Sequence, residues 1–135
     1  MYKKILVPVV FDEEHDTQAS FLAAKALANE GAAFTVMHVL EVIPAYAMTQ
    51  IPAEILADSR ADTERKLDRA ASALPGASPV LVAGHAGREI VEFARENAVD
   101  CIIMASQKPG LGHFFMGSTA DWVVRHAKCS VHVAR

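Results

Sequence analysis

The chain has 135 residues, of which 52% are hydrophobic, and its 16 acidic residues against 13 Lys and Arg give a formal net charge of -3. This composition excludes a strongly charged disordered chain. It also argues against nucleic acid as the main partner, because a nucleic-acid binder is expected to present a basic surface. A single domain over residues 1–135 is expected, since a chain of this length can bury a substantial core.

No membrane or export segment is evident. No apolar run approaches the roughly 18 residues that cross a bilayer, and the chain passes directly into the apolar run Ile5-Leu6-Val7 without a signal-peptide pattern. Two cysteines do not make a disulfide framework. The expectation is a cytoplasmic protein with reduced thiols and no membrane partner.

The first half of the chain alternates apolar runs with helical periodicity. It predicts, in order, a strand over Lys3–Val10, a helix from Asp16 or Thr17 to Asn29 or Glu30, a strand over Ala33–Leu40, an irregular segment over Glu41–Pro52 and a helix over Ala53–Leu74. Pro8 limits the first strand because proline donates no NH. Gly31 suits the end of the first helix.

The second half repeats this alternation. It predicts a strand over Pro79–Ala83, a helix after Gly84-His85-Ala86-Gly87 that turns Ile90, Val91, Ala94 and Ala98 inward, a strand over Asp100–Ala105, a helix ending near His126 and a strand over Ser130–Ala134. Each strand is apolar throughout, and parallel strands need crossover connections. The fold class is therefore α/β, an open, doubly wound, five-stranded parallel sheet with helices on both faces.

Small residues precede the last helix in Gly117-Ser118-Thr119. The first NH groups of a helix have no partner within it, and the helix dipole adds positive potential there. Glycine allows close approach, so this turn suits a phosphate group. The alternative is a plain cap, because Ser118-x-x-Asp121 matches a capping box.

The same stretch resembles the closing signature of the universal stress protein family. Gly117-Ser118-Thr119 and the segment Ala120–Val133 match the family's last turn, helix and strand. Nucleotide-binding members carry the motif Gly-x-x-Gly, followed by nine further residues and then this turn. Those two glycines are replaced here by Met104 and Gln107 or, with a loop one residue shorter, by Ala105 and Lys108. The form Ala-Ser-x-x-Pro at 105–109 resembles a branch with a proline in this loop.

The resemblance implies strand order 3-2-1-4-5 and an adenine nucleotide, ATP or AMP, at the switch point between strands one and four, with Mg²⁺ possible beside ATP. Val10 stands where these members carry an Asp that meets the nucleoside. Asp12 is close enough in sequence to substitute for it, and the alternative is a turn carboxylate that caps nearby NH groups. Val39 matches the position whose backbone reads the adenine edge. The candidate binding residues are Pro8, Val9, Val10, Asp12, Val39, Ala105, Ser106, Gln107, Lys108, Gly110, Gly112, Gly117, Ser118 and Thr119.

The resemblance also implies a cytoplasmic role in stress adaptation and a homodimer formed through Val131–Ala134. No catalytic residue is assigned, and ATP turnover is expected to be absent or slow. The spacing His126-x-x-Cys129-x-x-His132 is not expected to hold a metal, because a closed zinc site needs four ligands. The alternative function is a nucleotide-free dimeric interaction module, which Val10 and the missing glycines favour.

Overall fold

The computed structural model describes residues 1–11, 17–41, 45–105 and 117–134. The described residues form a single five-stranded parallel sheet with strand order β3-β2-β1-β4-β5, which confirms the predicted fold class and order. The elements are β1 (Tyr2–Pro8), α1 (Thr17–Leu27), β2 (Ala28–Leu40), α2 (Ala45–Met48), α3 (Ala53–Ser72), β3 (Ser78–Ala83), α4 (Ala86–Glu96), β4 (Cys101–Ala105), α5 (Ser118–His126) and β5 (Ser130–Ala134).

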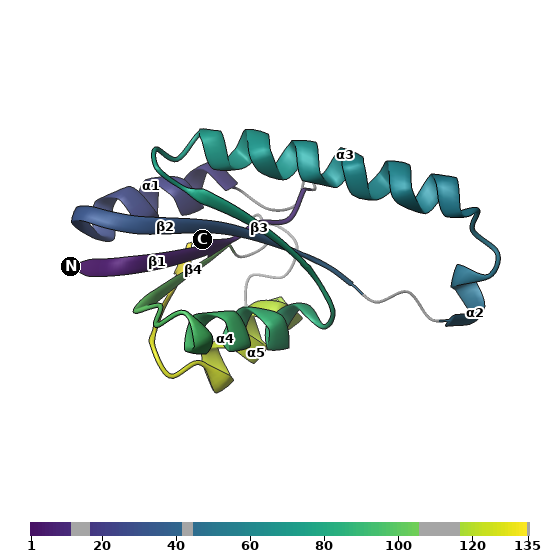
Figure 1. Ribbon diagram of the computed structural model, residues 1–135. Coiled ribbons are helices and arrows are strands. Elements are labelled where there is room, and N and C mark those ends of the chain that lie inside the picture. Colours follow the sequence, from purple (N-terminus) through teal and green to yellow (C-terminus); the bar gives the residue numbers. More distant parts are fainter. Residues whose placement is uncertain (12–16, 42–44, 106–116, 135) are drawn as a thin grey trace.

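Helices cover both faces of the sheet, with α1 and α3 on one side and α4 and α5 on the other (Figure 1). Successive residues of a strand point to opposite faces. In β1, Ile5 and Val7 join the cluster that packs under α1 and α3, whereas Leu6 joins the cluster under α4 and α5. Because both faces are covered, the central strands need apolar side chains at every position, which explains their continuous apolar runs.

The first helix ends at Leu27, so the prediction that it extends to Asn29 or Glu30 is wrong. Strand β2 begins directly at Ala28, which pairs with Tyr2 of β1. The register then shifts between Tyr2 and Lys4, and Gly31 lies within the extra length of β2 at a φ of 77°. Gly31 therefore accommodates a strand irregularity rather than ending a helix, and its positive φ favours glycine there.

Other predicted boundaries differ less. Strand β1 stops at Pro8 rather than Val10, although the Val9 NH still donates to the Met37 carbonyl at 2.8 Å. Helix α3 ends at Ser72, two residues before the predicted end. The segment predicted to be irregular contains the short helix α2. No helix within the described ranges is long and apolar enough to cross a membrane.

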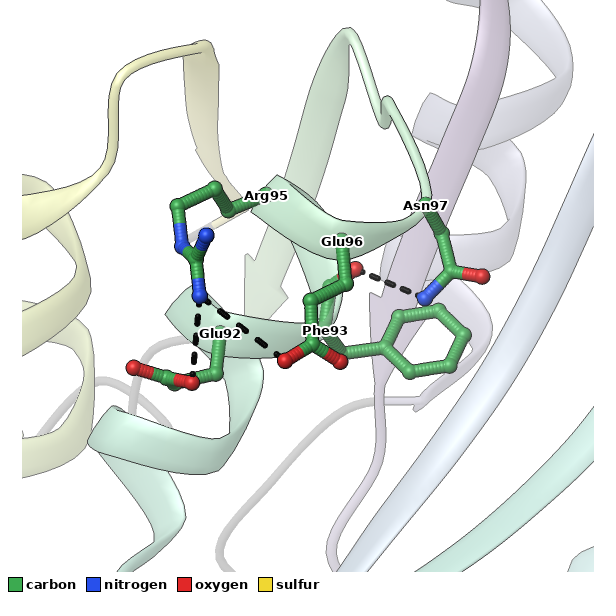
Figure 2. Close-up of polar contacts among 5 residues, drawn as sticks. All are labelled: Glu92, Phe93, Arg95, Glu96 and Asn97. Atoms are coloured by element: carbon green, nitrogen blue, oxygen red, sulfur yellow. Dashed lines mark hydrogen bonds and ion pairs between the residues drawn. The ribbon is translucent and has the colours of Figure 1, made fainter.

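Side-chain contacts close the last turn of α4 (Figure 2). The Asn97 amide donates to the Phe93 carbonyl at 2.9 Å, and the Arg95 guanidinium lies 3.4 Å from Glu92 and 3.8 Å from Glu96. The Phe93 carbonyl also accepts from the backbone NH of Asn97 at 3.0 Å, so the side chain and the backbone of Asn97 both bond to it. The ion pairs are exposed and contribute little to stability.

The chain reverses after α4 and enters β4 beside the start of β1. Ala98 takes a φ of 52° and is exposed, so the prediction that it faces inward is wrong. The Asp100 carboxylate accepts hydrogen bonds from the backbone NH groups of Lys3 and Lys4 at 2.8 and 2.9 Å. These bonds align β4 with β1 and thereby set where the two strands end at the opposite edge.

Candidate functional site

A cavity of about 440 Å³ lies at the carboxyl ends of the central strands. Residues from β1, β2 and β4 form its floor, and the amino-terminal parts of α1, α4 and α5 contribute its walls. In an open parallel sheet the connections diverge to opposite faces at such a point and leave a crevice outside the strand ends. The lining residues are Pro8, Val9, Val10, Thr17, Ser20, Met37, His38, Val39, Leu40, Glu41, Ala86, Ile90, Met104, Ala105, Gly117, Ser118, Thr119 and Ala120.

The first turn of α5 forms one wall of the cavity. Gly117 is the N-cap residue, Ser118 is exposed and Thr119 is half-buried. A Cβ placed on Gly117 would meet no atom of the described residues within 4 Å, so these residues leave open space in front of this backbone. Because the first NH groups of a helix lack intrahelical partners and carry the positive end of its dipole, this wall can accept an anion.

The alternative that Ser118 and Asp121 form a capping box is wrong. Ser118 is the first residue within α5 rather than its cap, and the cap, Gly117, has no side chain to accept a hydrogen bond. The Asp121 carboxylate instead pairs with Arg125 one turn later at 3.1 Å. Neither residue therefore caps the start of the helix in the way that the sequence pattern suggested.

The end of β1 is held against β2 by two hydrogen bonds around Val9. Its NH donates to the Met37 carbonyl, and its carbonyl oxygen lies 2.8 Å from Nδ1 of His38. The ring of Phe11 lies 4.9 Å from the His38 ring. Together these contacts fix the segment in which Val10, with 44% of its surface exposed, replaces the carboxylate expected by resemblance.

Met104 and Ala105 end β4 on the opposite side of the crevice. Met104 is 5% exposed and packs into the cluster under α4 and α5, so its side chain forms part of the wall. Val10 is likewise a wall residue, and the cavity stays open between them. An acidic group, Glu41, follows β2 at the end of the cavity away from β4 and α5. The negative charge of Glu41 and the positive helix start therefore lie on opposite sides.

Eight of the predicted binding residues line this one cavity, although they come from four separate segments. They are Pro8, Val9, Val10, Val39, Ala105, Gly117, Ser118 and Thr119. The other six lie outside the described residues, namely Asp12, Ser106, Gln107, Lys108, Gly110 and Gly112. The structure thus brings the described candidates together, and their contact with a ligand stays a prediction.

Ten lining residues were not among the predicted binding residues, and four of these are polar or charged, namely Thr17, Ser20, His38 and Glu41. His38 was one of six histidines without an assigned role, and Ser20 was treated as an ordinary helix residue. The available signal for His38 was its place next to Val39 at the end of an otherwise apolar strand. Nothing local distinguished Ser20, because its burial depends on how α1 packs against the sheet.

Three further histidine and cysteine side chains in the described part of the chain, those of His85, Cys101 and His126, do not line this cavity. His126 stacks on Trp122 with ring centroids 4.1 Å apart, and His85 caps α4 by accepting from the Arg88 NH. Burial raises the pKa of the Cys101 thiol to about 11, so the thiol stays protonated at neutral pH. Within the described ranges, no three His, Cys, Asp or Glu residues gather closely enough to hold a metal ion.

The family model described as the universal stress protein family matches residues 1–135. The chain belongs to the universal stress protein family. The universal stress protein G of Escherichia coli O157:H7 is 29% identical to it over 147 residues, covering 100% of both chains. The solved structure of the hypothetical protein MJ0577 superposes with a TM-score of 0.82 at 25% identity, covering 99% of this universal stress protein and 96% of that chain.

Two further solved structures share the fold and carry adenine nucleotides. The universal stress protein of Archaeoglobus fulgidus was solved in complex with dAMP and has a TM-score of 0.69 at 19% identity, covering 99% of this chain and 98% of that one. A universal stress protein family protein from Arabidopsis thaliana was solved with AMP bound. It has a TM-score of 0.63 at 17% identity, and the match covers 97% of this chain and 90% of that one. At these identities the likeness concerns the fold.

Proposed function

We propose that this universal stress protein binds an adenine nucleotide, ATP or AMP, in the cavity between the ends of β1 and β4. The observation that carries the proposal is the open first turn of α5 at Gly117, Ser118 and Thr119, which forms one wall of that cavity. Its volume, about 440 Å³, falls within the range of roughly 300–1,000 Å³ that is usual for small-molecule sites.

The charges around the cavity favour one orientation of the nucleotide. The phosphates lie at the positive start of α5, away from the carboxylate of Glu41. The base then lies toward the end of β2, where the backbone of Val39 is available to its edge. The two fold relatives with bound dAMP and AMP support an adenine nucleotide as the ligand.

Hydrolysis is proposed to be absent or slow. Of the lining residues that the structure describes, Glu41 alone carries a carboxylate, and it lies on the side away from α5. Mg²⁺ therefore enters with the phosphates of ATP rather than through a pair of protein carboxylates.

The role that follows is a nucleotide-responsive one in stress adaptation, carried out in the cytoplasm by one domain over residues 1–135.

Mass spectrometry of the natively purified protein tests this function. Adenine nucleotide is expected in the fraction released on denaturation, and millimolar ATP or AMP is expected to raise the thermal midpoint, because a ligand that binds only the folded state stabilises it. GTP at the same concentration is the matched control for the base. Absence of both the released nucleotide and the thermal shift would reject the proposal.

A dimeric interaction module is the second candidate, and β5 is the observation that favours it. This strand lies at one edge of the sheet, with Ser130 and His132 exposed. An unpaired edge can pair with a second copy across a two-fold axis. We expect a homodimer through Val131–Ala134, measured by light scattering. His132→Asp brings two like charges together and should shift the dimer toward monomer.

A further inference from the structure

The side chain of Ser20 has no evident structural use. It is 1% exposed and is the one polar residue in the buried class among the residues that the structure describes. Its Oγ has no hydrogen-bond partner within the same described ranges. A buried hydroxyl without a partner destabilises the folded state, because it has lost its hydrogen bonds to water and gained none in return. Such groups are rare in native proteins and call for an explanation.

Ser20 lies on the wall of the nucleotide cavity. Thr17 precedes it by three residues on α1, so the two hydroxyl-bearing side chains occupy the same face of the helix. Thr17 is half-buried and lines the same cavity. The α1 wall is therefore polar at this point, whereas Ile90 and Met104, which line the cavity from the face that α4 and α5 cover, are apolar.

His38 adds a group of defined hydrogen-bonding character. Its Nδ1 lies 2.8 Å from the Val9 carbonyl oxygen, which can only accept, so Nδ1 carries a proton and donates. In the neutral imidazole the other nitrogen, Nε2, then has a free lone pair and accepts. The contact with Phe11 restrains the same ring.

Both groups approach the cavity from one side of the sheet. His38 lies two residues after Val36 in β2, so it projects to the face that α1 and α3 cover. Ser20 is followed on α1 by Phe21, which packs into the cluster on that same face. Thr17, Ser20 and His38 thus all line the cavity from the face of the sheet that α1 and α3 cover, opposite the face of α5, and we call these three residues the polar corner.

We infer that this polar corner binds a sugar hydroxyl of the nucleotide. The serine hydroxyl can both donate and accept, and Nε2 of neutral His38 accepts. A sugar hydroxyl, which donates and accepts at once, satisfies both. A phosphate oxygen only accepts and would face the lone pair of Nε2, and an amine cannot accept from the serine hydroxyl.

This inference rests on the proposed nucleotide site and adds a second anchor to it. The phosphates are held by the first turn of α5, and the sugar is held by Ser20 and His38. The gain on binding is larger than for an ordinary hydrogen bond, because the hydroxyl of Ser20 is already removed from water in the free protein.

Calorimetric titration of AMP against 2′,3′-dideoxy-AMP tests the inference. The wild-type protein is expected to bind AMP about 5- to 30-fold more tightly, as one to two hydrogen bonds imply. Ser20→Ala should remove most of this preference while leaving the affinity for the dideoxy nucleotide unchanged. Ser59→Ala, an exposed serine on α3, is the matched control and should behave as the wild type.

His38→Asn separates the two roles of the histidine. The shorter amide can still donate to the Val9 carbonyl, but it has no group at the position of Nε2. The preference for AMP should fall in this variant as in Ser20→Ala. Thermal unfolding of the free proteins provides a second readout, because Ser20→Ala is expected to hold or raise the midpoint when it removes an unpartnered buried hydroxyl.

The outcomes distinguish this inference from the proposed function. If neither nucleotide binds the wild-type protein, the function itself is rejected and the inference with it. If both nucleotides bind and Ser20→Ala keeps the preference for AMP, or if the wild type shows no preference, the site stands and the polar corner is rejected as its sugar contact.

Discussion

Gly87 of α4 lies directly against Trp122 of α5: a Cβ added to Gly87 would lie 2.5 Å from Cδ1 of the indole. Such a distance is too short for two carbon atoms, so only glycine allows the two helices to pack this closely. Both helices contribute residues to the cavity wall. The contact therefore determines where the first turn of α5 lies relative to the strand ends.

Gly87→Ala is expected to destabilise the protein by roughly 1–3 kcal/mol, because one methyl group forces the helices apart in a packed interface. Urea unfolding followed by the fluorescence of Trp122 would measure the loss. Nucleotide affinity should fall as well, since α5 shifts. A suitable control is Ala53→Gly at the exposed start of α3, which should leave affinity unchanged. Wild-type stability in Gly87→Ala would contradict the close packing.

Gly117→Asp is expected to abolish nucleotide binding while the fold is kept. The Cβ of the added side chain meets no atom of the residues that the structure describes, and Gly117 has an ordinary φ of -59°. Aspartate is also a favourable N-cap residue, so the thermal midpoint of the free protein should hold or rise. Its carboxylate repels the phosphates from the same NH groups. Gly117→Asn has nearly the same size without the charge and should retain more affinity. Equal affinities in the two variants would show that charge is not the cause.

Asp100 is expected to make stability depend on pH in the acid range. Burial acts to raise the pKa of this carboxyl, but the hydrogen bonds from the NH groups of Lys3 and Lys4 outweigh it and lower the pKa below its ordinary value. The folded state therefore binds this proton less readily than the unfolded state does. The resulting stabilisation is present above the ordinary pKa and is lost as pH falls through the lowered one.

Urea unfolding at pH 7 and pH 3 measures this contribution. Asp100→Asn should lower stability at pH 7 and should flatten the decline between the two pH values. The matched control is Asp68→Asn on the exposed face of α3, which should keep the wild-type decline. A decline in Asp100→Asn as steep as that of the wild type would assign the pH dependence to other groups.

Cys101 is expected to resist alkylation in the folded protein. Burial raises the pKa of its thiol from 9.0 to about 11, and only the thiolate reacts. At pH 8 this shift alone lowers the thiolate fraction about 100-fold. Iodoacetamide labelling with peptide mass spectrometry, with and without urea, would measure the difference. Fast labelling of Cys101 without urea would show that the start of β4 is open to solvent.

The parallel sheet could be predicted from the sequence pattern, whereas its strand order, and with it the place proposed for the site, came from the resemblance to the family. Five apolar runs separated by helical patterns leave few arrangements, because strands without polar residues must be covered on both faces. The turn at Gly117 was recognisable because small residues directly before a helix mark a place where backbone NH groups are accessible. These are local signals, and the structure confirms the parallel sheet to which they led.

Other features depend on segments that are distant in the chain, and only the tertiary structure decided them. Gly31 lies in a strand because β1 pairs with the residues that local propensity assigned to a helix. Ser20 is buried because α1 packs on β1 and β4, and His38 bonds to Val9 because β1 and β2 are paired neighbours in the sheet. A side chain's burial and partners follow from packing and register, which residue types along one segment do not specify.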